Sequence, residues 1–175
     1  MNAHDDLAEV DAVVASARAA QQAYETGGSQ QRYDRAAQAA AWAIMEPAHN
    51  RHLAELSVQT TGLGNVADKI TKNHRKTLGL MRDIAEVKSF GVISDNSETG
   101  ITEIARPIGV IGAVVPSTNP AATPANNIIN ALKCGNAIVL SPSPKGVPAC
   151  AALIGYIHAE FDKLGEDKAL VQMVP

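Results

Sequence analysis

The sequence predicts an α/β protein in which N-terminal helices and a β-hairpin precede half of a doubly wound parallel sheet. The main observation is a strand–helix–strand pattern in the C-terminal half. Residues 108–115 are uncharged and rich in β-branched side chains, which is typical of a strand buried on both faces of a parallel sheet. Apolar residues at helical spacing follow over residues 125–132, and a second apolar run covers residues 137–140. Upstream of the hairpin, apolar residues recur only at helical spacing.

Three helices are predicted at the start of the chain. Apolar residues recur every three or four positions over residues 7–24, which indicates an amphipathic helix that ends at Gly27. Ser29 is placed to cap the second helix, which should end before Pro47. A third, short helix is expected over about residues 48–61.

A fourth helix carries the concentrated charge of the chain, and Asn65, with Asp68 three residues later, is placed as its cap. Its expected buried stripe is Val66, Ile70, His74, Thr77, Met81 and Ile84. Its cations are Lys69, Lys72, Arg75, Lys76, Arg82 and Lys88. They indicate either a solvated face or subunit contact, or attraction of a polyphosphate ligand. A nucleic-acid module is disfavoured because no aromatic platform accompanies the charge.

A hairpin is expected after this helix, because two strand-like runs, residues 90–94 and 101–106, flank a hydrophilic turn. A two-stranded hairpin is marginal alone, so we expect it to pack on another subunit of a homodimer or homotetramer. The predicted units are therefore an N-terminal helical segment (1–89), the hairpin (90–107) and part of a parallel-sheet domain (108–175).

One more helix should close at Gly165 before a buried strand over residues 170–175. A buried strand there would be a poor edge, so the sequence is interpreted as truncated.

The composition excludes several classes of protein. With 46% hydrophobic residues in 175, the chain can bury one real core. A net charge of −3 provides no general attraction to nucleic acid or to an anionic membrane. The sequence has no bilayer-spanning apolar run and an acidic N-terminus without a signal peptide. Two cysteines form no disulfide framework, which favours the cytoplasm, and no Cys/His cluster suggests a metal site.

Ligands are expected at two Pro/Ser-rich loops, residues 116–120 and 141–144, because each follows a predicted parallel strand. Open α/β sheets bind ligands at the carboxyl ends of their strands. Gly109 and Gly112 are not interpreted as a dinucleotide fingerprint. They lie before and within the strand, whereas that fingerprint follows a strand and opens a helix.

Three blocks in order carry a resemblance to a known family: TGLGNVADKITKN (61–73), PSTNP (116–120) and ALKCGNAIVLSPSPKG (131–146). Together they resemble the aldehyde dehydrogenase superfamily, and more narrowly its CoA-acylating branch, over essentially all 175 residues. The resemblance implies a Rossmann-like NAD(P)-binding domain and conversion of a small aldehyde, CoA and NAD(P)⁺ to an acyl-CoA. Residues 103–133 look most similar to branch members that act on sulfoacetaldehyde.

The resemblance places a catalytic role on Asn119, at the position of the family's oxyanion-hole asparagine. Addition of a thiolate to an aldehyde generates an alkoxide. One fixed N–H donor directed at that oxygen lowers the activation free energy by about 3–4 kcal/mol. The alternative role of Asn119 is to cap the helix that begins near Pro120.

The resemblance also places the cofactor on the two loops. Pro116, Ser117 and Thr118 correspond to the nicotinamide side, where Ser117 replaces the usual Trp of non-acylating relatives and leaves a roomier site. The adenosine ribose or its phosphate corresponds to the segment Ser141, Pro142, Ser143 and Lys145. Ser141 stands where non-acylating relatives have Lys, so the choice between NAD and NADP stays open. Ser143 and Lys145 could bind a phosphate, and the alternative for Ser143 is a hydroxyl that stabilises the turn.

The family's nucleophilic cysteine is expected downstream of residue 175, because neither Cys134 nor Cys150 matches it. Both are expected to be small core residues, and the chain alone is expected to be inactive. Among the histidines, His74 is interpreted as a core or interface residue, and the others as surface residues: His4, His49, His52 and His158. The competing function is a non-catalytic assembly or nucleotide-binding fragment, and the competing substrate is acetaldehyde or another short-chain aldehyde.

Overall fold

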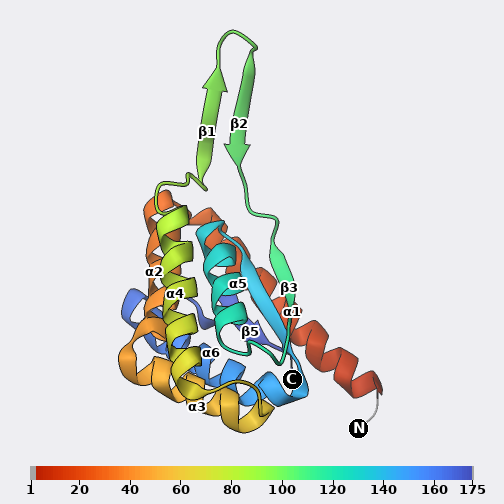
Figure 1. Ribbon diagram of the computed structural model, residues 1–175. Coiled ribbons are helices and arrows are strands. Elements are labelled where there is room, and N and C mark those ends of the chain that lie inside the picture. Colours follow the sequence, from red (N-terminus) through yellow and green to blue (C-terminus); the bar gives the residue numbers. More distant parts are fainter. Residues whose placement is uncertain (1–2, 175) are drawn as a thin grey trace.

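The computed structural model describes residues 3–174 and confirms the predicted fold class (Figure 1). Pro175, which the predicted last strand includes, lies outside the described residues, as does the side chain of His4. The helices are α1 (Ala3–Thr26), α2 (Gln30–Met45), α3 (Pro47–Thr61), α4 (Val66–Ile84), α5 (Ala122–Lys133) and α6 (Val147–Leu164). The strands are β1 (Gly91–Asn96), β2 (Ile101–Ala105), β3 (Val110–Val115), β4 (Ala137–Pro142) and β5 (Val171–Met173). Short 3₁₀ turns are η1 (Pro144–Gly146) and η2 (Lys168–Leu170).

The sheet is parallel, in the order β3-β4-β5, with α5 and α6 as its two crossovers. Both crossovers step in the same direction, so the right-handed rule places both helices on one face. Helix α1 contacts all three strands from the other face (Figure 1). Strand β4 is therefore buried on both sides from Ala137 to Leu140.

Strand β3 differs from the prediction of a strand buried on both faces. Val115 is buried against α5, whereas Val114 is 83% exposed and Ile108, just before the strand, is 85% exposed. The reason is its position at an edge of the described sheet, where α5 covers one face and α1 covers the other face only in part. Sequence alone does not distinguish an edge strand from a central one when both are apolar.

One core joins the N-terminal helices to the sheet, and α2 lies at its centre, in contact with α3, α4, α5 and α6. Its caps are as predicted, since Ser29 accepts a hydrogen bond from Arg32 N at 3.1 Å and the helix ends before Pro47. Its buried face consists of Tyr33, Ala36, Ala37, Ala40, Ala41, Ala43 and Ile44. These small side chains let α2 approach α5 closely. The predicted boundaries between the three units stay predictions.

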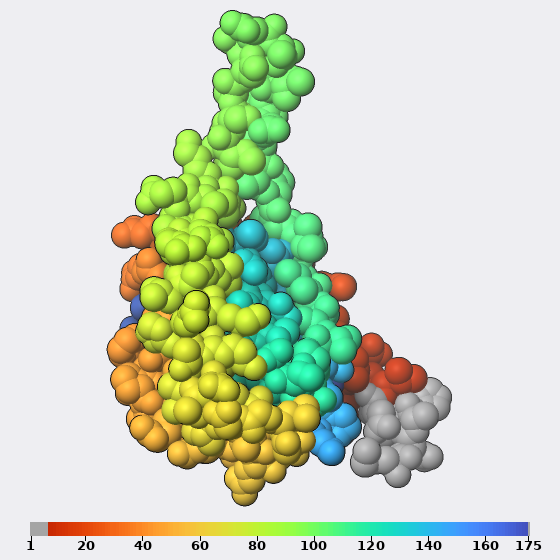
Figure 2. Space-filling view, in the orientation of Figure 1, coloured from red at the N-terminus to blue at the C-terminus, as the bar shows by residue number. Residues whose placement is uncertain are grey.

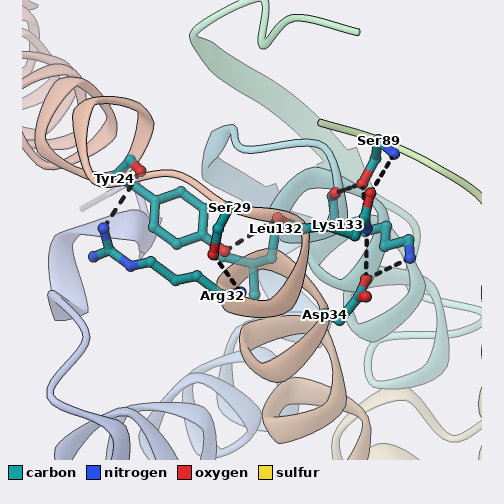
Figure 3. A network of polar contacts seen from close by, with 8 residues as sticks. Tyr24, Ser29, Arg32, Asp34, Ser89, Leu132 and Lys133 are labelled. Carbon is teal, nitrogen blue, oxygen red and sulfur yellow. Dashed lines mark hydrogen bonds and ion pairs between the residues drawn. The ribbon is translucent and has the colours of Figure 1, made fainter. Parts of the chain in front are cut away.

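A polar network ties the ends of α1, α2 and α5 together (Figure 3). The Tyr24 hydroxyl donates to the Leu132 carbonyl at 3.2 Å, and Arg32 donates to the Tyr24 carbonyl at 3.4 Å. Lys133 pairs with Asp34 and is almost fully buried. The Ser89 hydroxyl donates to the Lys133 carbonyl, which fixes the chain where it leaves for the hairpin.

The hairpin β1–β2 projects away from the body of the molecule (Figures 1 and 2). It is antiparallel as predicted, with a register shift between Val92 and Ser94. Four of its aliphatic side chains are exposed: Val92, Ile93, Ile101 and Ile104. No helix of residues 3–174 has both the length and the apolar character that a bilayer crossing requires.

Gly135→Ala is expected to lower the free energy of unfolding by about 3 kcal/mol. Gly135 has a φ of +74°, and a Cβ there would lie 2.6 Å from the Tyr33 ring. The left-handed backbone accounts for about 1 kcal/mol and the overpacking for about 2 kcal/mol. Urea unfolding of the variant measures the loss. Gly62→Ala is the matched control, because Gly62 has a φ of +70° and open space, so it should lose only about 1 kcal/mol. Equal losses at the two glycines would contradict the overpacking.

Candidate functional site

The two predicted loops meet at the carboxyl end of the sheet, because β3 and β4 are parallel and in register up to the pair Val115 and Pro142. Ser143 N donates to the Val115 carbonyl at 2.9 Å, which joins the start of one loop to the other. A Cβ on Gly146 would lie 3.1 Å from Pro120, so glycine allows the loops to approach this closely.

Every predicted site residue is at least partly exposed, although the hydroxyl of Ser143 is itself buried. Pro116, Thr118 and Lys145 are exposed, whereas Ser117, Asn119, Ser141, Pro142 and Ser143 are half-buried. One detail differs from the sequence prediction. Ser141 and Pro142 belong to the end of β4 rather than to a loop, because their partners on β3 extend the ladder.

Ser141 lies on a different side of the sheet from Asn119. It pairs with Val114 and lines a groove of about 560 Å³ on the open face of β3, together with residues of α1 that include Val14 and Arg18. Asn119 instead faces α4, as its hydrogen bond to that helix shows. The predicted cofactor and oxyanion residues therefore lie around one sheet end but on two sides of it.

Ser143 does not stabilise its turn through its side chain, so that alternative is wrong. Its hydroxyl is buried and has no hydrogen-bond partner in the described residues, whereas its carbonyl accepts from Gly146 N at 2.7 Å. A buried hydroxyl without a partner is costly. Because the hydroxyl has no accessible surface, a ligand oxygen could complete its bonding only if the loop exposed it.

Two lysines of α4 contact the loop after β3, and sequence reasoning did not single them out. Lys69, only 5% exposed, donates from Nζ to the Thr118 carbonyl at 3.3 Å. Lys72, three residues later, donates from Nζ to Asn119 Oδ1. The i, i+3 spacing places both on one side of the helix. That spacing was the available signal, but it lay within a charge run that favours a solvated face.

The predicted stripe of α4 is wrong in part, since the helix buries Lys69, Asn73 and Thr77 while His74 is exposed. Asn73 Nδ2 donates to Asn50 Oδ1, and Asn50 Nδ2 donates to the Ile70 carbonyl, each at 3.0 Å. These two contacts of Asn50 on α3 fix the rotation of α4 and so aim its lysines at the loop. The remaining cations are exposed: Arg75, Lys76, Arg82 and Lys88. Whether they form a solvated face, a subunit contact or a ligand-attracting surface stays a prediction.

Asn119 does not cap α5, so this alternative is also wrong. The cap position is Ala121, and no side chain there accepts a hydrogen bond from the helix. The Asn119 backbone carbonyl accepts from Thr123 N at 3.3 Å, but its side chain turns to Lys72. Its Nδ2 has a single described partner, the Thr118 hydroxyl, at the long distance of 3.5 Å. An N–H donor is thereby left available at this sheet end.

The sequence matches the aldehyde dehydrogenase family over residues 2–175. The chain belongs to this family. A curated relative, the acylating sulfoacetaldehyde dehydrogenase of Cupriavidus necator, is 61% identical over 95% of this chain. The chain spans only 34% of that relative's length.

Solved structures agree with this assignment. An acetylating aldehyde dehydrogenase from Geobacillus thermoglucosidasius superposes with a TM-score of 0.88 at 32% identity, over 97% of this chain and 37% of that one. A propionaldehyde dehydrogenase from Rhodopseudomonas palustris, solved with bound CoA and an acylated cysteine, superposes with a TM-score of 0.77 at 30% identity. It covers 93% of this chain and 36% of that one. The structural neighbours are thus acylating members of the aldehyde dehydrogenase family.

Neither cysteine of this aldehyde dehydrogenase chain is placed as a nucleophile. Cys150 is buried as predicted, and burial raises the pKa of its thiol to about 12. Cys134 is exposed, so its prediction as a core residue is wrong. It follows α5 at the amino end of β4, and that helix of 12 residues, about 18 Å long, separates it from the loop of Asn119. Partial burial also raises the pKa of its thiol.

The histidines differ in part from the surface prediction. His52 is exposed, but His49 is half-buried and stacks on the Tyr156 ring with centroids 3.7 Å apart. His158 is also half-buried, with Nε2 2.8 Å from the Val171 carbonyl. Within the described residues, no group of three His, Cys, Asp or Glu side chains could hold a metal ion.

Lys69→Met is expected to raise the free energy of unfolding by about 1 kcal/mol at pH 7, because it removes a buried cation that has no carboxylate partner in the described residues. Burial, and next the charge of Lys72, lower the pKa of the Lys69 ammonium. The folded protein therefore releases this proton at lower pH than the unfolded chain, and the wild type gains stability as the pH rises through that window.

Urea unfolding at pH 7 and about pH 10 checks both statements, since the advantage of the variant should shrink at the higher pH. Lys76→Met, on the exposed part of the same helix, should change stability by less than about 0.5 kcal/mol. A Lys69→Met protein that is clearly less stable than the wild type would contradict the idea that burying the Lys69 ammonium destabilises the fold.

Proposed function

We propose that this chain is the N-terminal part of a CoA-acylating aldehyde dehydrogenase, which oxidises a small aldehyde with NAD(P)⁺ and CoA to an acyl-CoA. The observation that carries the proposal is the Asn119 carboxamide. It lies at the carboxyl end of β3 with Oδ1 engaged by Lys72 and Nδ2 left to donate. A thiolate that adds to an aldehyde forms a carbon–sulfur bond and moves the carbonyl π electrons onto oxygen. The Asn119 N–H would stabilise that alkoxide.

The cofactor fits the residues at the sheet end. The exposed Lys145 ammonium is a charged donor suited to a phosphate oxygen. The unpartnered Ser143 hydroxyl would be a second, neutral donor once the loop exposes it. Ser141 and Pro142 would line the same part of the site, with Pro116, Ser117 and Thr118 on the nicotinamide side. When bound, the nicotinamide accepts the hydride. NAD and NADP are both retained as candidates, because no residue of this set selects between them.

The nucleophile is proposed to lie on a segment outside these 175 residues. Cys150 is inert through burial, and Cys134 lies at the wrong end of the sheet. The oxidised thioester would then pass its acyl group to CoA, which releases the cysteine thiolate. The 175 residues by themselves are proposed to be inactive.

Sulfoacetaldehyde is the proposed aldehyde, on the basis of the 61% identical relative, and acetaldehyde is the main alternative.

We further propose a cytoplasmic homodimer or homotetramer. Its contact would be the hairpin, whose exposed aliphatic side chains favour burial against a second copy.

The proposed activity is tested with a polypeptide of the relatives' length that contains this sequence. It is expected to form NAD(P)H from sulfoacetaldehyde only when CoA is present, with acetaldehyde a poorer substrate. The absorbance of NAD(P)H and the mass of the acyl-CoA product measure the reaction. The 175-residue chain is the control and should show no turnover. Absence of CoA-dependent turnover from the longer polypeptide with either aldehyde would favour the non-catalytic alternative.

Asn119→Ala in that enzyme is expected to lower kcat about 10²- to 10³-fold, the usual effect of losing one oxyanion donor. Cofactor affinity should change little, because the proposed ribose and phosphate contacts lie on the β4 side. Steady-state kinetics and a fluorescence titration with NAD(P)H measure the two quantities. An unchanged kcat would remove the oxyanion role of Asn119.

A further inference from the structure

The contact between Lys72 and Asn119 defines which way the carboxamide faces. An ammonium group can only donate hydrogen bonds, so the amide atom that meets Lys72 Nζ must be the oxygen. The Nδ2 group consequently points to the opposite side. Without such a partner the amide could rotate by about 180° and present its oxygen where a donor is required.

We propose that Lys72 is a positioning residue that orients and polarises the Asn119 carboxamide, while Lys69 holds the Thr118 carbonyl. This inference rests on the proposed function, because it assumes that Asn119 donates to the alkoxide. A charge-assisted hydrogen bond to Oδ1 draws electron density from the amide, which makes its N–H groups stronger donors. The developing oxyanion would then meet a donor that is both aimed and strengthened.

The surroundings show that this arrangement is built into the fold. Lys69 is buried and Lys72 is half-buried, and neither has an ion-pair partner among the described residues. The nearby carboxylate of Asp68 accepts instead from Asn65 Nδ2 at 2.6 Å. Two neighbouring cations without a counter-charge lower the free energy of unfolding of the protein when no ligand is bound. They become favourable when negative charge develops beside them, which is the condition for electrostatic preorganisation.

A different use of Lys72 would be direct binding of an anionic group of a substrate, such as a sulfonate or a phosphate. The two roles differ in kinetics. Direct ground-state binding raises KM and leaves kcat unchanged when it is lost, whereas orientation of an oxyanion donor lowers kcat. The contact of Lys72 with Asn119 Oδ1 rather than with open solvent favours the positioning role.

The test is a double-mutant cycle in the complete enzyme, with variants Lys72→Met, Asn119→Ala and the pair, read as the rate of the first turnover of NAD(P)H formation. Lys72→Met is expected to lower this rate about 10- to 100-fold, in line with loss of a hydrogen bond to a charged group. In the Asn119→Ala background it should cause less than about a twofold further loss, because Lys72 acts through Asn119. Lys72→Arg, which keeps a charged donor, should recover part of the rate. Lys76→Met controls for loss of one positive charge on α4 and should leave the rate unchanged.

The outcomes separate this inference from the proposed function. Independent, multiplying losses from Lys72→Met and Asn119→Ala would overturn the positioning role while leaving the oxyanion role of Asn119 intact. A raised KM with an unchanged first-turnover rate in Lys72→Met would overturn it in favour of direct anion binding. An unchanged rate in Asn119→Ala would overturn the oxyanion assignment and the inference together. Thermal unfolding of each variant excludes loss of the fold as the cause.

Discussion

The close approach of α2 to α5 is the packing on which the rest of the structure depends. It is possible because the buried face of α2 is mainly alanine, which leaves room for α5, whose buried side chains include Ile128, Ile129 and Leu132. Helix α2 also contacts α3, α4 and α6, so its position sets theirs. In a chain with 3% aromatic residues, most of the core is built from alanine and aliphatic side chains, and Tyr24, Tyr33 and Phe161 are its large buried aromatic residues.

The candidate site follows from this packing through α3 and α4. Asn50 of α3 holds Asn73 of α4, and the resulting rotation turns Lys69 and Lys72 inward rather than to solvent. A helix with the same sequence on an isolated surface would leave these ammonium groups hydrated, because an unpaired buried cation is costly. Charged side chains are usually exposed, so lysines that are turned inward at the end of the sheet are an exception to this rule. Exceptions of this kind are expected at functional sites.

Among the exposed apolar residues of the described chain, two groups lie close to each other in sequence. One is the outer face of β3 with Ile108 and Val114, and the other is the hairpin with Val92 and Ile101. Exposed aliphatic groups of this kind mark surfaces for association. The proposed longer enzyme and its second subunit would provide partners for both, and the relative from Cupriavidus necator is about three times the length of this chain.

The element order, the caps at Ser29 and Asn65, the stop at Gly165 and the two loops that meet at one end of the sheet were all predictable from the amino-acid sequence. These features depend on local backbone preferences and on the period of the apolar residues, which a single sequence displays. Tertiary structure alone decided that β3 is an edge strand, that Cys134 is exposed and that Lys69 is buried while His74 is not. Edge position and helix rotation depend on which neighbours cover each face, and those neighbours are distant in sequence. For that reason the lysines that contact the Asn119 loop became recognisable only once α3, α4 and β3 were placed together.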